Sequence, residues 1–464
     1  MTLQVNIIIL IGKVNLMIEY KLLLAVLFGI AVLLFLILKL KLHAFISLLI
    51  ASISVGVISG MPPLEIMNTV KEGMGGTLGF VATVIGLGAM FGAILEHSGG
   101  AKVIANYLLK KLGIKRAPSA MALAGFIVAI PVFFEVAFIL LVPVIYALQK
   151  QTKKSLLIYA LPLLAGLAVT HAFIPPTPGP IAVAEIIGVD LGWVILIGAM
   201  VGLPTAIIGG IFYGKYIGNK IYIEAPFQEN NLTIIEEDKN PDIKIILSII
   251  AIPIVLILLS TFVSSGIISI QNNQILNIIN LIGHPFSALI IANMIAWYVL
   301  GIKQGFTKKQ LLDITTKSMG PAGMIILITG AGGVFKQVLV NTGAGKMIAE
   351  SLVDVGFPVL LFSFIVAVLV RLIQGSATVA MITAAGLVSP LISDIAYDNF
   401  NLACIVISIA AGSTFMSHVN DSGFWLVSQF LGMTEKQTFK TWTIMTGILS
   451  VSGFLLASLI NFVF

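Results

Sequence analysis

AGSTFMSHVNDSGFW, residues 411–425, interrupts a hydrophobic segment that runs from about residue 401 to residue 431 and is otherwise long enough to cross a bilayer. The stretch places glycines, hydroxyl side chains, a histidine, an asparagine and an aspartate in the middle of that segment. Because unpaired backbone groups are costly in hydrocarbon, unwound backbone is tolerated there only beside protein or a water-filled cavity. One interpretation is a broken transmembrane helix with a ligand site at the break. The other is a kinked helix whose polar residues bind neighbouring helices.

The rest of the chain has the composition of a membrane protein with many helices. Of its 464 residues, 58% are hydrophobic and only 10% are charged. The net charge of +6 is assigned to cytoplasmic loops, and no nucleic-acid partner is expected. The single cysteine, Cys404, excludes an intrachain disulfide.

The lengths of the hydrophobic runs predict an all-α polytopic membrane protein. About ten full spans of about 20 residues are expected, some of them longer and broken, at 21–40, 43–60, 74–95, 155–185, 192–214, 243–263, 285–301, 319–340, 400–431 and 441–462. Two further stretches, 118–148 around PVFFEV and 357–394 around RLIQGSATVA, have polar or helix-breaking centres and predict re-entrant hairpins. Two ordinary spans joined by a tight turn are the alternative for each stretch.

The distribution of basic residues gives one consistent topology. With both hairpins re-entrant, the predicted cytoplasmic loops hold 20 of the 26 lysine and arginine residues, at 39–43, 96–117, 149–154, 215–244, 302–318 and 432–440. The predicted external loop 264–284 holds none. This assignment places both termini outside.

The chain also resembles itself at a shift of 244 residues. Residues 86–108 and 330–352 share nine identities in 23 positions, and Gly179 aligns with Gly423. Because the halves begin on opposite sides in the predicted topology, they form inverted repeats, which are typical of secondary transporters. The predicted division is an extension at 1–16 (translation could start at Met17), a first repeat at 17–218, a cytoplasmic linker at 219–242 and a second, inverted repeat at 243–464.

Five ionisable residues stand out inside the apolar segments. Arg371 lies in the second hairpin, where a buried charge needs a partner; that partner is either a substrate carboxylate or, in a structural ion pair, Glu135 or Asp421. Glu135 and Asp421 are the acids best placed to take up a proton. His171 and His418 lie in the two broken spans, and each is interpreted as a proton relay, a hydroxyl ligand or a structural histidine.

Six motifs in order now make the chain recognisable: GMGGTLGF, AIPVFFEV, THAFIPPTPGP, GAGGVFKQVLV, QGSATVAMITAAG and SHVNDSGFW. They resemble the gluconate permease (GntP) family of the ion transporter superfamily, over nearly everything after residue 20. The resemblance implies a symporter of the bacterial cytoplasmic membrane that imports gluconate or a related sugar acid with protons, by an elevator motion. Arg371 matches the sugar-acid members, Ser422 replaces their proline, and Thr177 stands where gluconate carriers have histidine. The expected substrate is therefore a small hydroxylated carboxylate.

Substrate binding is expected at residues of the second hairpin and of the two broken spans: Arg371, Gly375, Ser376, Thr378, Thr177, Gly179, His418 and Asn420. Proton coupling is assigned to Glu135, Asp421 and His171, with sodium as the competing ion. The chain is expected to be no enzyme and to hold no cofactor or metal; a homodimer is left open. The alternatives are a D-serine or other small-molecule carrier of the same fold, an ion channel and an intramembrane enzyme.

Overall fold

The computed structural model describes residues 20–33, 35–37, 39–226, 241–344, 347, 358–392, 397–419 and 421–463. Within these ranges the chain is helical, with short turns and no strand. The predicted all-α architecture is thus confirmed. The N-terminal extension and most of the linker between the halves lie outside the described residues.

The first half begins with the helix Tyr20–Ile37 and continues through α2 (Ala44–Ser59), α3 (Pro63–His97), α4 (Gly100–Leu112), α5 (Ala117–Val128), α6 (Phe134–Thr152), α7 (Leu157–Phe173), α8 (Pro178–Ile187), α9 (Leu191–Ala206) and α10 (Tyr213–Lys220). The second half contains α11 (Ile243–Ser264), α12 (Asn273–Gly283), α13 (Pro285–Ala296), α14 (Lys308–Asn341), α16 (Val359–Gln374), α17 (Ala377–Ile392), α18 (Asn399–Ser413), α19 (Ser422–Phe430), α20 (Glu435–Thr438) and α21 (Ile444–Val463).

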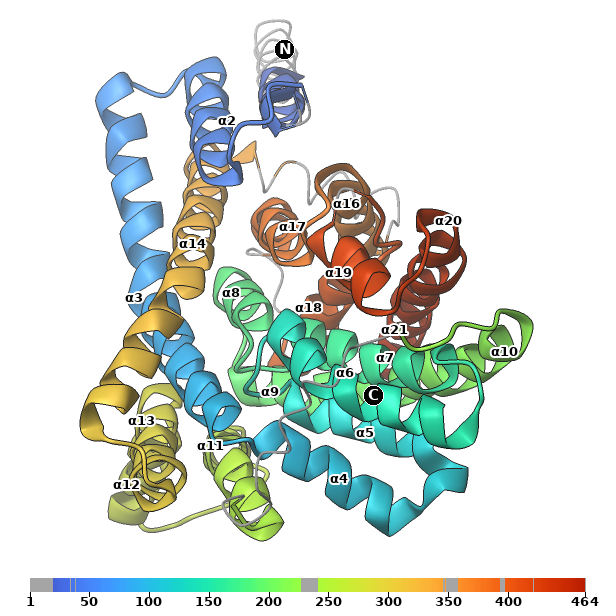
Figure 1. Cartoon of the computed structure of the whole chain (residues 1–464). Coiled ribbons are helices and arrows are strands. Elements are labelled where there is room, and N and C mark those ends of the chain that lie inside the picture. Colours follow the sequence, from blue (N-terminus) through green and yellow to red (C-terminus); the bar gives the residue numbers. More distant parts are fainter. Residues whose placement is uncertain are drawn as a thin grey trace, which may run out of the picture.

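Two long helices, α3 and α14, pack along each other in a column at one side of the molecule (Figure 1). Their glycine motifs explain the close approach. A Cβ on Gly73 would lie 2.7 Å from the Val334 Cα atom, and one on Gly333 would lie 2.0 Å from the Thr77 hydroxyl. Small residues therefore let the two backbones cross nearly in contact. Helices α5–α10 and α16–α21 form a separate body beside this column (Figure 1).

Four of the predicted interruptions appear as helix ends. The first hairpin is α5 and α6, and the first broken span is α7 and α8. The second hairpin is α16 and α17, joined at Gly375, whose φ of 86° is the left-handed conformation that glycine tolerates. The second broken span is α18 and α19, and the Asp421 carboxylate accepts a hydrogen bond from the Gly423 N–H at the start of α19.

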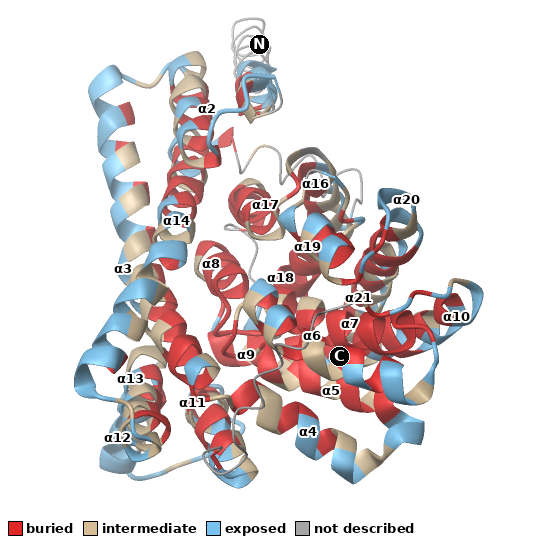
Figure 2. Ribbon diagram, viewed as in Figure 1, coloured by how far each residue is buried: buried red, intermediate tan, exposed pale blue. Residues whose placement is uncertain are grey.

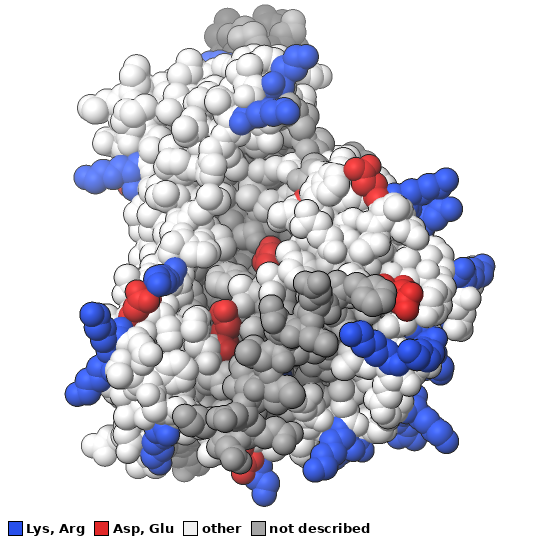
Figure 3. All heavy atoms as spheres, viewed as in Figure 1, with Lys and Arg blue, Asp and Glu red and all other residues white. Residues whose placement is uncertain are grey.

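The surface and the helix lengths fit a bilayer. In the described part of the chain, nine helices are long and apolar enough to cross a membrane. Burial concentrates in the body beside the column, at α5, α7, α8, α17 and α18, whereas α12 is largely exposed and α3 is a mixture of buried and exposed residues (Figure 2). On the face shown in Figure 3, Lys and Arg lie mostly along the outer margin. The path of the two hairpins relative to the bilayer stays a prediction, as does the orientation of the termini.

Two segments predicted to be loops contain helices. Residues 96–117 hold α4, whose buried residues Ala101, Ile104, Ala105 and Leu108 recur at helical spacing. Residues 264–284 hold α12, which begins at Asn272 with a side-chain cap. The apolar runs of both helices are too short to be read as spans. α4 buries only one face, so its apolar residues are spaced apart, and α12 lies on the surface with a single buried residue.

Candidate functional site

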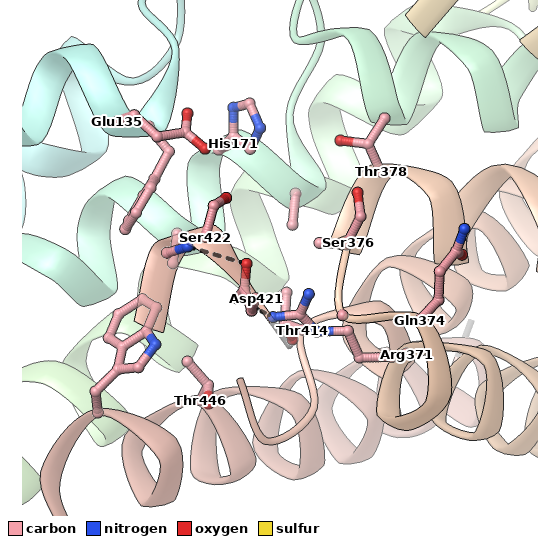
Figure 4. Close-up of a pocket in the computed structure, with 17 residues that line it drawn as sticks. Glu135, His171, Arg371, Gln374, Ser376, Thr378, Thr414, Asp421, Ser422 and Thr446 are labelled. Atoms are coloured by element: carbon pink, nitrogen blue, oxygen red, sulfur yellow. Dashed lines mark hydrogen bonds and ion pairs between the residues drawn. The ribbon is translucent and has the colours of Figure 1, made fainter. Parts of the chain in front are cut away.

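The tips of both hairpins, the end of α7 and the break between α18 and α19 meet at one cavity of about 320 Å³ (Figure 4). Since one water takes roughly 30 Å³ of liquid volume, this space suits a small solute. Its lining comes from α6, α7, the α16–α17 turn, the α18–α19 break and the last helical segment, Glu435–Val463: Phe134, Glu135, Ala168, His171, Ala172, Arg371, Gln374, Gly375, Ser376, Ala377, Thr378, Thr414, Asp421, Ser422, Gly423, Trp442 and Thr446.

A buried ion pair joins the second hairpin to the second broken span. Arg371 is 4% exposed, and its Nη2 atom lies 2.5 Å from the Asp421 Oδ2 atom. The Ser417 hydroxyl also donates to this oxygen, at 2.5 Å. The Nη1 atom of Arg371 is buried and has no hydrogen-bond partner among the described residues. Arg371 therefore faces the cavity with half of its donor fork occupied.

The unwound segment between α18 and α19 is fixed by the last helix. Trp442 Nε1 donates to the Ser417 hydroxyl at 2.7 Å, and the Thr443 hydroxyl donates to the Ser417 carbonyl at 2.5 Å. The Ser417 N–H donates in turn to the Thr446 hydroxyl, at 3.0 Å. These bonds satisfy backbone that no helix pairs, and so they set the position of Asp421.

Three helices begin at the edge of this cavity. α6 begins at Phe134, α17 at Ala377 and α19 at Ser422, and all three residues line it. The N-terminus of a helix carries partial positive charge and unpaired N–H groups. Together with Arg371, these ends make the cavity favourable for an anion.

Glu135 and His171 lie together on the opposite wall from the ion pair (Figure 4). They interact electrostatically, and the His171 ring packs at a tilt against Phe133 with ring centroids 6.3 Å apart. In the part of the chain that the structure describes, the buried His171 Nδ1 atom has no hydrogen-bond partner. The first half of the chain thus supplies one acid and one imidazole, and the second half supplies the Arg371–Asp421 pair.

The family model for GntP family permeases matches residues 21–463. This chain belongs to the GntP permease family. The permease is 41% identical over 425 residues to the low-affinity gluconate transporter of Escherichia coli, covering 92% of this chain and 95% of that one. It is 40% identical to the gluconate permease of Pseudomonas aeruginosa, with the same coverage of both chains. The gluconate permease of Bacillus subtilis is 38% identical, over 92% of this chain and 96% of its own.

Solved structures support the fold of this permease. The YdaH transporter of Alcanivorax borkumensis superposes with a TM-score of 0.64 at 13% identity, covering 90% of this chain and 98% of that one. MtrF of Neisseria gonorrhoeae gives 0.62 at 14% identity, over 85% and 83% of the two chains. Membership of the permease family and the named relatives make this chain a multi-pass membrane transporter and not an enzyme, and a bacterial cytoplasmic membrane fits those relatives.

Seven of the residues predicted for binding or coupling line the cavity of the permease: Glu135, His171, Arg371, Gly375, Ser376, Thr378 and Asp421. Three others lie outside the lining. The buried Thr177 donates its hydroxyl to the Ile174 carbonyl at 2.6 Å, and Gly179 packs against Met381. His418 Nε2 lies 3.0 Å from the Leu372 carbonyl. Asn420 falls outside the described residues.

Sequence reasoning missed five polar residues of the lining, namely Gln374, Thr414, Ser422, Trp442 and Thr446. Gln374 had a usable signal, because it is a polar side chain in an apolar run directly before the glycine turn. Trp442 and Thr446 had none, since they belong to a last span without a charged or helix-breaking residue at its centre.

A second cation inside a predicted span was also missed. Lys336 lies on α14, within the span predicted at 319–340, and its Nζ atom donates to the Ile186 carbonyl near the end of α8 at 2.5 Å. The buried Ser389 hydroxyl of α17 donates to the same carbonyl at 2.7 Å. Lys336 thus links the α3–α14 column to the neighbouring body.

Proposed function

We propose that this permease imports gluconate or a closely related sugar acid together with protons. The observation that carries the proposal is the buried Arg371, whose unpaired Nη1 atom lines a solute-sized cavity where three helices begin. The names of the relatives supply the substrate class, and the site chemistry is compatible with it. Arg371 would bind the substrate carboxylate, because its planar fork matches two carboxylate oxygens.

Asp421 is the carboxylate that a substrate would have to displace. It holds the Nη2 atom of Arg371, and a bidentate substrate would need that nitrogen as well as Nη1. Once displaced, an ionised Asp421 would be left beside an anion in a buried site, which is costly. A proton on Asp421 removes that cost: Arg371 then pairs with the substrate, Asp421 is neutral, and the net charge of the group equals that of the empty site. One proton would thus accompany each anion.

Glu135 is the second acid that could carry a proton. Glu135 lines the same cavity and interacts with His171. The imidazole of His171 would exchange a proton with it. Ser376 and Thr378, at the start of α17, would bind substrate hydroxyls together with the N–H groups of that helix. Thr177, Gly179, His418 and Asn420 remain predicted substrate-binding residues.

The division of the permease into the α3–α14 column and the body beside it supports an elevator mechanism. Nearly all of the cavity lining comes from the body that packs beside the α3–α14 column, and none of it comes from α3 or α14. A movement of that body along the column would carry the cavity with it. The inverted repeats predicted from the sequence supply the two related orientations that such a movement needs.

Uptake into proteoliposomes tests this proposal. Purified permease should accumulate radiolabelled gluconate when the outside is acidified, and an equal sodium gradient at clamped pH should give no accumulation. Accumulation driven by sodium alone would replace the proton with sodium. Preferential uptake of D-serine over every sugar acid would replace the substrate class, and empty liposomes provide the baseline.

A further inference from the structure

Three buried side-chain atoms without a hydrogen-bond partner, among the described residues, belong to side chains that line this single cavity. They are Arg371 Nη1, His171 Nδ1 and Gln374 Oε1. Buried polar groups in folded proteins are nearly always paired, so unpaired ones at a binding site indicate what the ligand must supply. Arg371 Nη1 requires an acceptor. Gln374 Oε1 can only accept, so it requires a donor.

Two other polar side chains of the cavity lining, Thr414 and Thr446, already have hydrogen-bond partners within the protein. The Thr414 hydroxyl donates to the Ala411 carbonyl at 2.7 Å. The Thr446 hydroxyl donates to the Thr443 carbonyl at 2.9 Å and accepts from the Ser417 N–H. Both side chains line the cavity without needing a ligand to complete their bonds, whereas Gln374 does need one.

Gln374 is the last residue of α16, one helical turn after Arg371 and directly before the Gly375 turn. In Figure 4 the Arg371 side chain extends toward Asp421, and the Gln374 amide lies apart from the guanidinium on the side of Ser376 and Thr378. A substrate with its carboxylate on Arg371 would therefore meet Gln374 with another part of its carbon chain. The donor there would be a hydroxyl group.

We infer that Gln374 is a specificity-determining residue, which accepts a hydrogen bond from a substrate hydroxyl and makes the permease selective for polyhydroxylated over plain carboxylic acids. This inference rests on the proposed function. A site built to pair a hydroxyl rejects the analogue that lacks it, because its own polar group is then left buried and unpaired. His171 Nδ1 offers a second, similar position on the opposite wall.

A cycle of substrate and side-chain deletions tests the role of Gln374. Equilibrium binding of gluconate and of its monodeoxy analogues would be measured on purified wild-type permease and on Gln374→Leu. On the wild type, one analogue should bind about 10–100-fold more weakly than gluconate. On Gln374→Leu, gluconate itself should weaken by a similar factor, and that same analogue should show no further loss, because the partner is already gone.

Two further variants keep the test sharp. Gln337→Leu is the matched control, since it makes the same exchange on α14, which contributes nothing to the cavity lining; it should leave the pattern of analogue binding as in the wild type. Gln374→Met, an unbranched side chain without an acceptor oxygen, repeats the test if the leucine variant does not fold.

The outcomes separate the two proposals. If the wild type binds gluconate but every monodeoxy analogue equally well, or if the analogue loses as much affinity on Gln374→Leu as on the wild type, the role of Gln374 is refuted and the proposed function stands. If the wild type binds no sugar acid at all, the proposed function fails, and this inference fails with it.

Discussion

The two broken helices of the permease, α7–α8 and α18–α19, are built alike. At positions 244 residues apart, Thr177 and Asp421 each directly precede the second half-helix. The carbonyls of Ile186 and Phe430, again 244 residues apart, each accept a hydrogen bond near the end of that half-helix. The donor is in each case a hydroxyl from the returning arm of the other half's hairpin, Ser389 for α8 and Tyr146 for α19. The hairpin of each half therefore donates a hydrogen bond to the broken helix of the other half.

The chemistry at the two breaks differs. Thr177 is buried, 3% exposed, and its hydroxyl is satisfied by the neighbouring Ile174 carbonyl. Asp421 instead reaches the cavity and pairs with Arg371. The same helical plan thus serves as packing in one half and as a charged site in the other. This difference teaches that an equivalent position in a repeated fold does not imply an equivalent role.

The largest effect is expected from removing the charge at the second break. Arg371→Gln should reduce uptake of sugar acids by at least about 100-fold, because the fork that we propose to bind the substrate carboxylate is lost. Arg371→Lys keeps the charge without the fork and should weaken binding strongly while preserving membrane insertion. Both effects would be measured as uptake in proteoliposomes, with size-exclusion profiles confirming folding.

The double variant Arg371→Gln with Asp421→Asn sharpens this prediction. If the ion pair is only structural, the single change leaves Asp421 buried and unpaired, and neutralising it should restore transport. We expect no restoration, since the substrate would still lack its cation. Recovered uptake in the double variant would assign Arg371 a purely structural role.

The next effect concerns the two residues that precede the half-helices. Asp421→Asn should keep exchange of substrate across the membrane but abolish accumulation driven by a pH gradient, because the variant lacks the carboxyl group that we propose to carry the proton. Thr177→Val should lower transport only a few-fold, since its hydroxyl serves one local bond worth about 1 kcal/mol. Counterflow and gradient-driven uptake, measured side by side, distinguish these outcomes; equal losses in both variants would erase the contrast between the breaks.

A smaller effect, on thermal stability, is expected from Lys336, which donates a hydrogen bond to the Ile186 carbonyl near the end of α8. Lys336→Met should lower the melting temperature by a few degrees, because a hydrogen bond from a charged group contributes about 1.5–3 kcal/mol. Lys317→Met is the matched control on the same helix, since Lys317 and its partner Asp313 are 77% and 61% exposed and contribute little. Equal shifts in thermal denaturation of the two variants would show that Lys336 is not a specific link.

The smallest effect should come from the hydroxyl at the end of α19. Tyr146→Phe removes only the neutral hydrogen bond to the Phe430 carbonyl and should cost about 0.5–1.5 kcal/mol. The melting temperature should therefore fall less than in Lys336→Met. A larger fall than in that variant would reverse the ranking of the two helix ends.

Several features of this permease were readable from the sequence because they depend on local chemistry. Hydrophobic runs located the spans, and polar or helix-breaking residues located the hairpin turns and the two breaks. Six motifs in order identified the family, and Arg371 stood out because a charge in an apolar segment is rare. The helices α4 and α12 escaped this reading, since a short amphipathic or surface helix has no run of apolar residues.

Only the tertiary structure decided which residues line the cavity. Arg371 and Asp421 are 50 positions apart in the chain, and the sequence left the partner of Arg371 open between Asp421, Glu135 and a substrate. Thr177 and His418 lie in motifs as distinctive as those of Ser376 and Thr378, yet their side chains bond to backbone carbonyls, of the nearby Ile174 and of Leu372 on α16. Gln374, Trp442 and Thr446 line the cavity through the packing of helices from distant parts of the chain. Composition and helix breaks are properties of neighbouring residues, whereas the residues that meet at a site depend on how the helices pack.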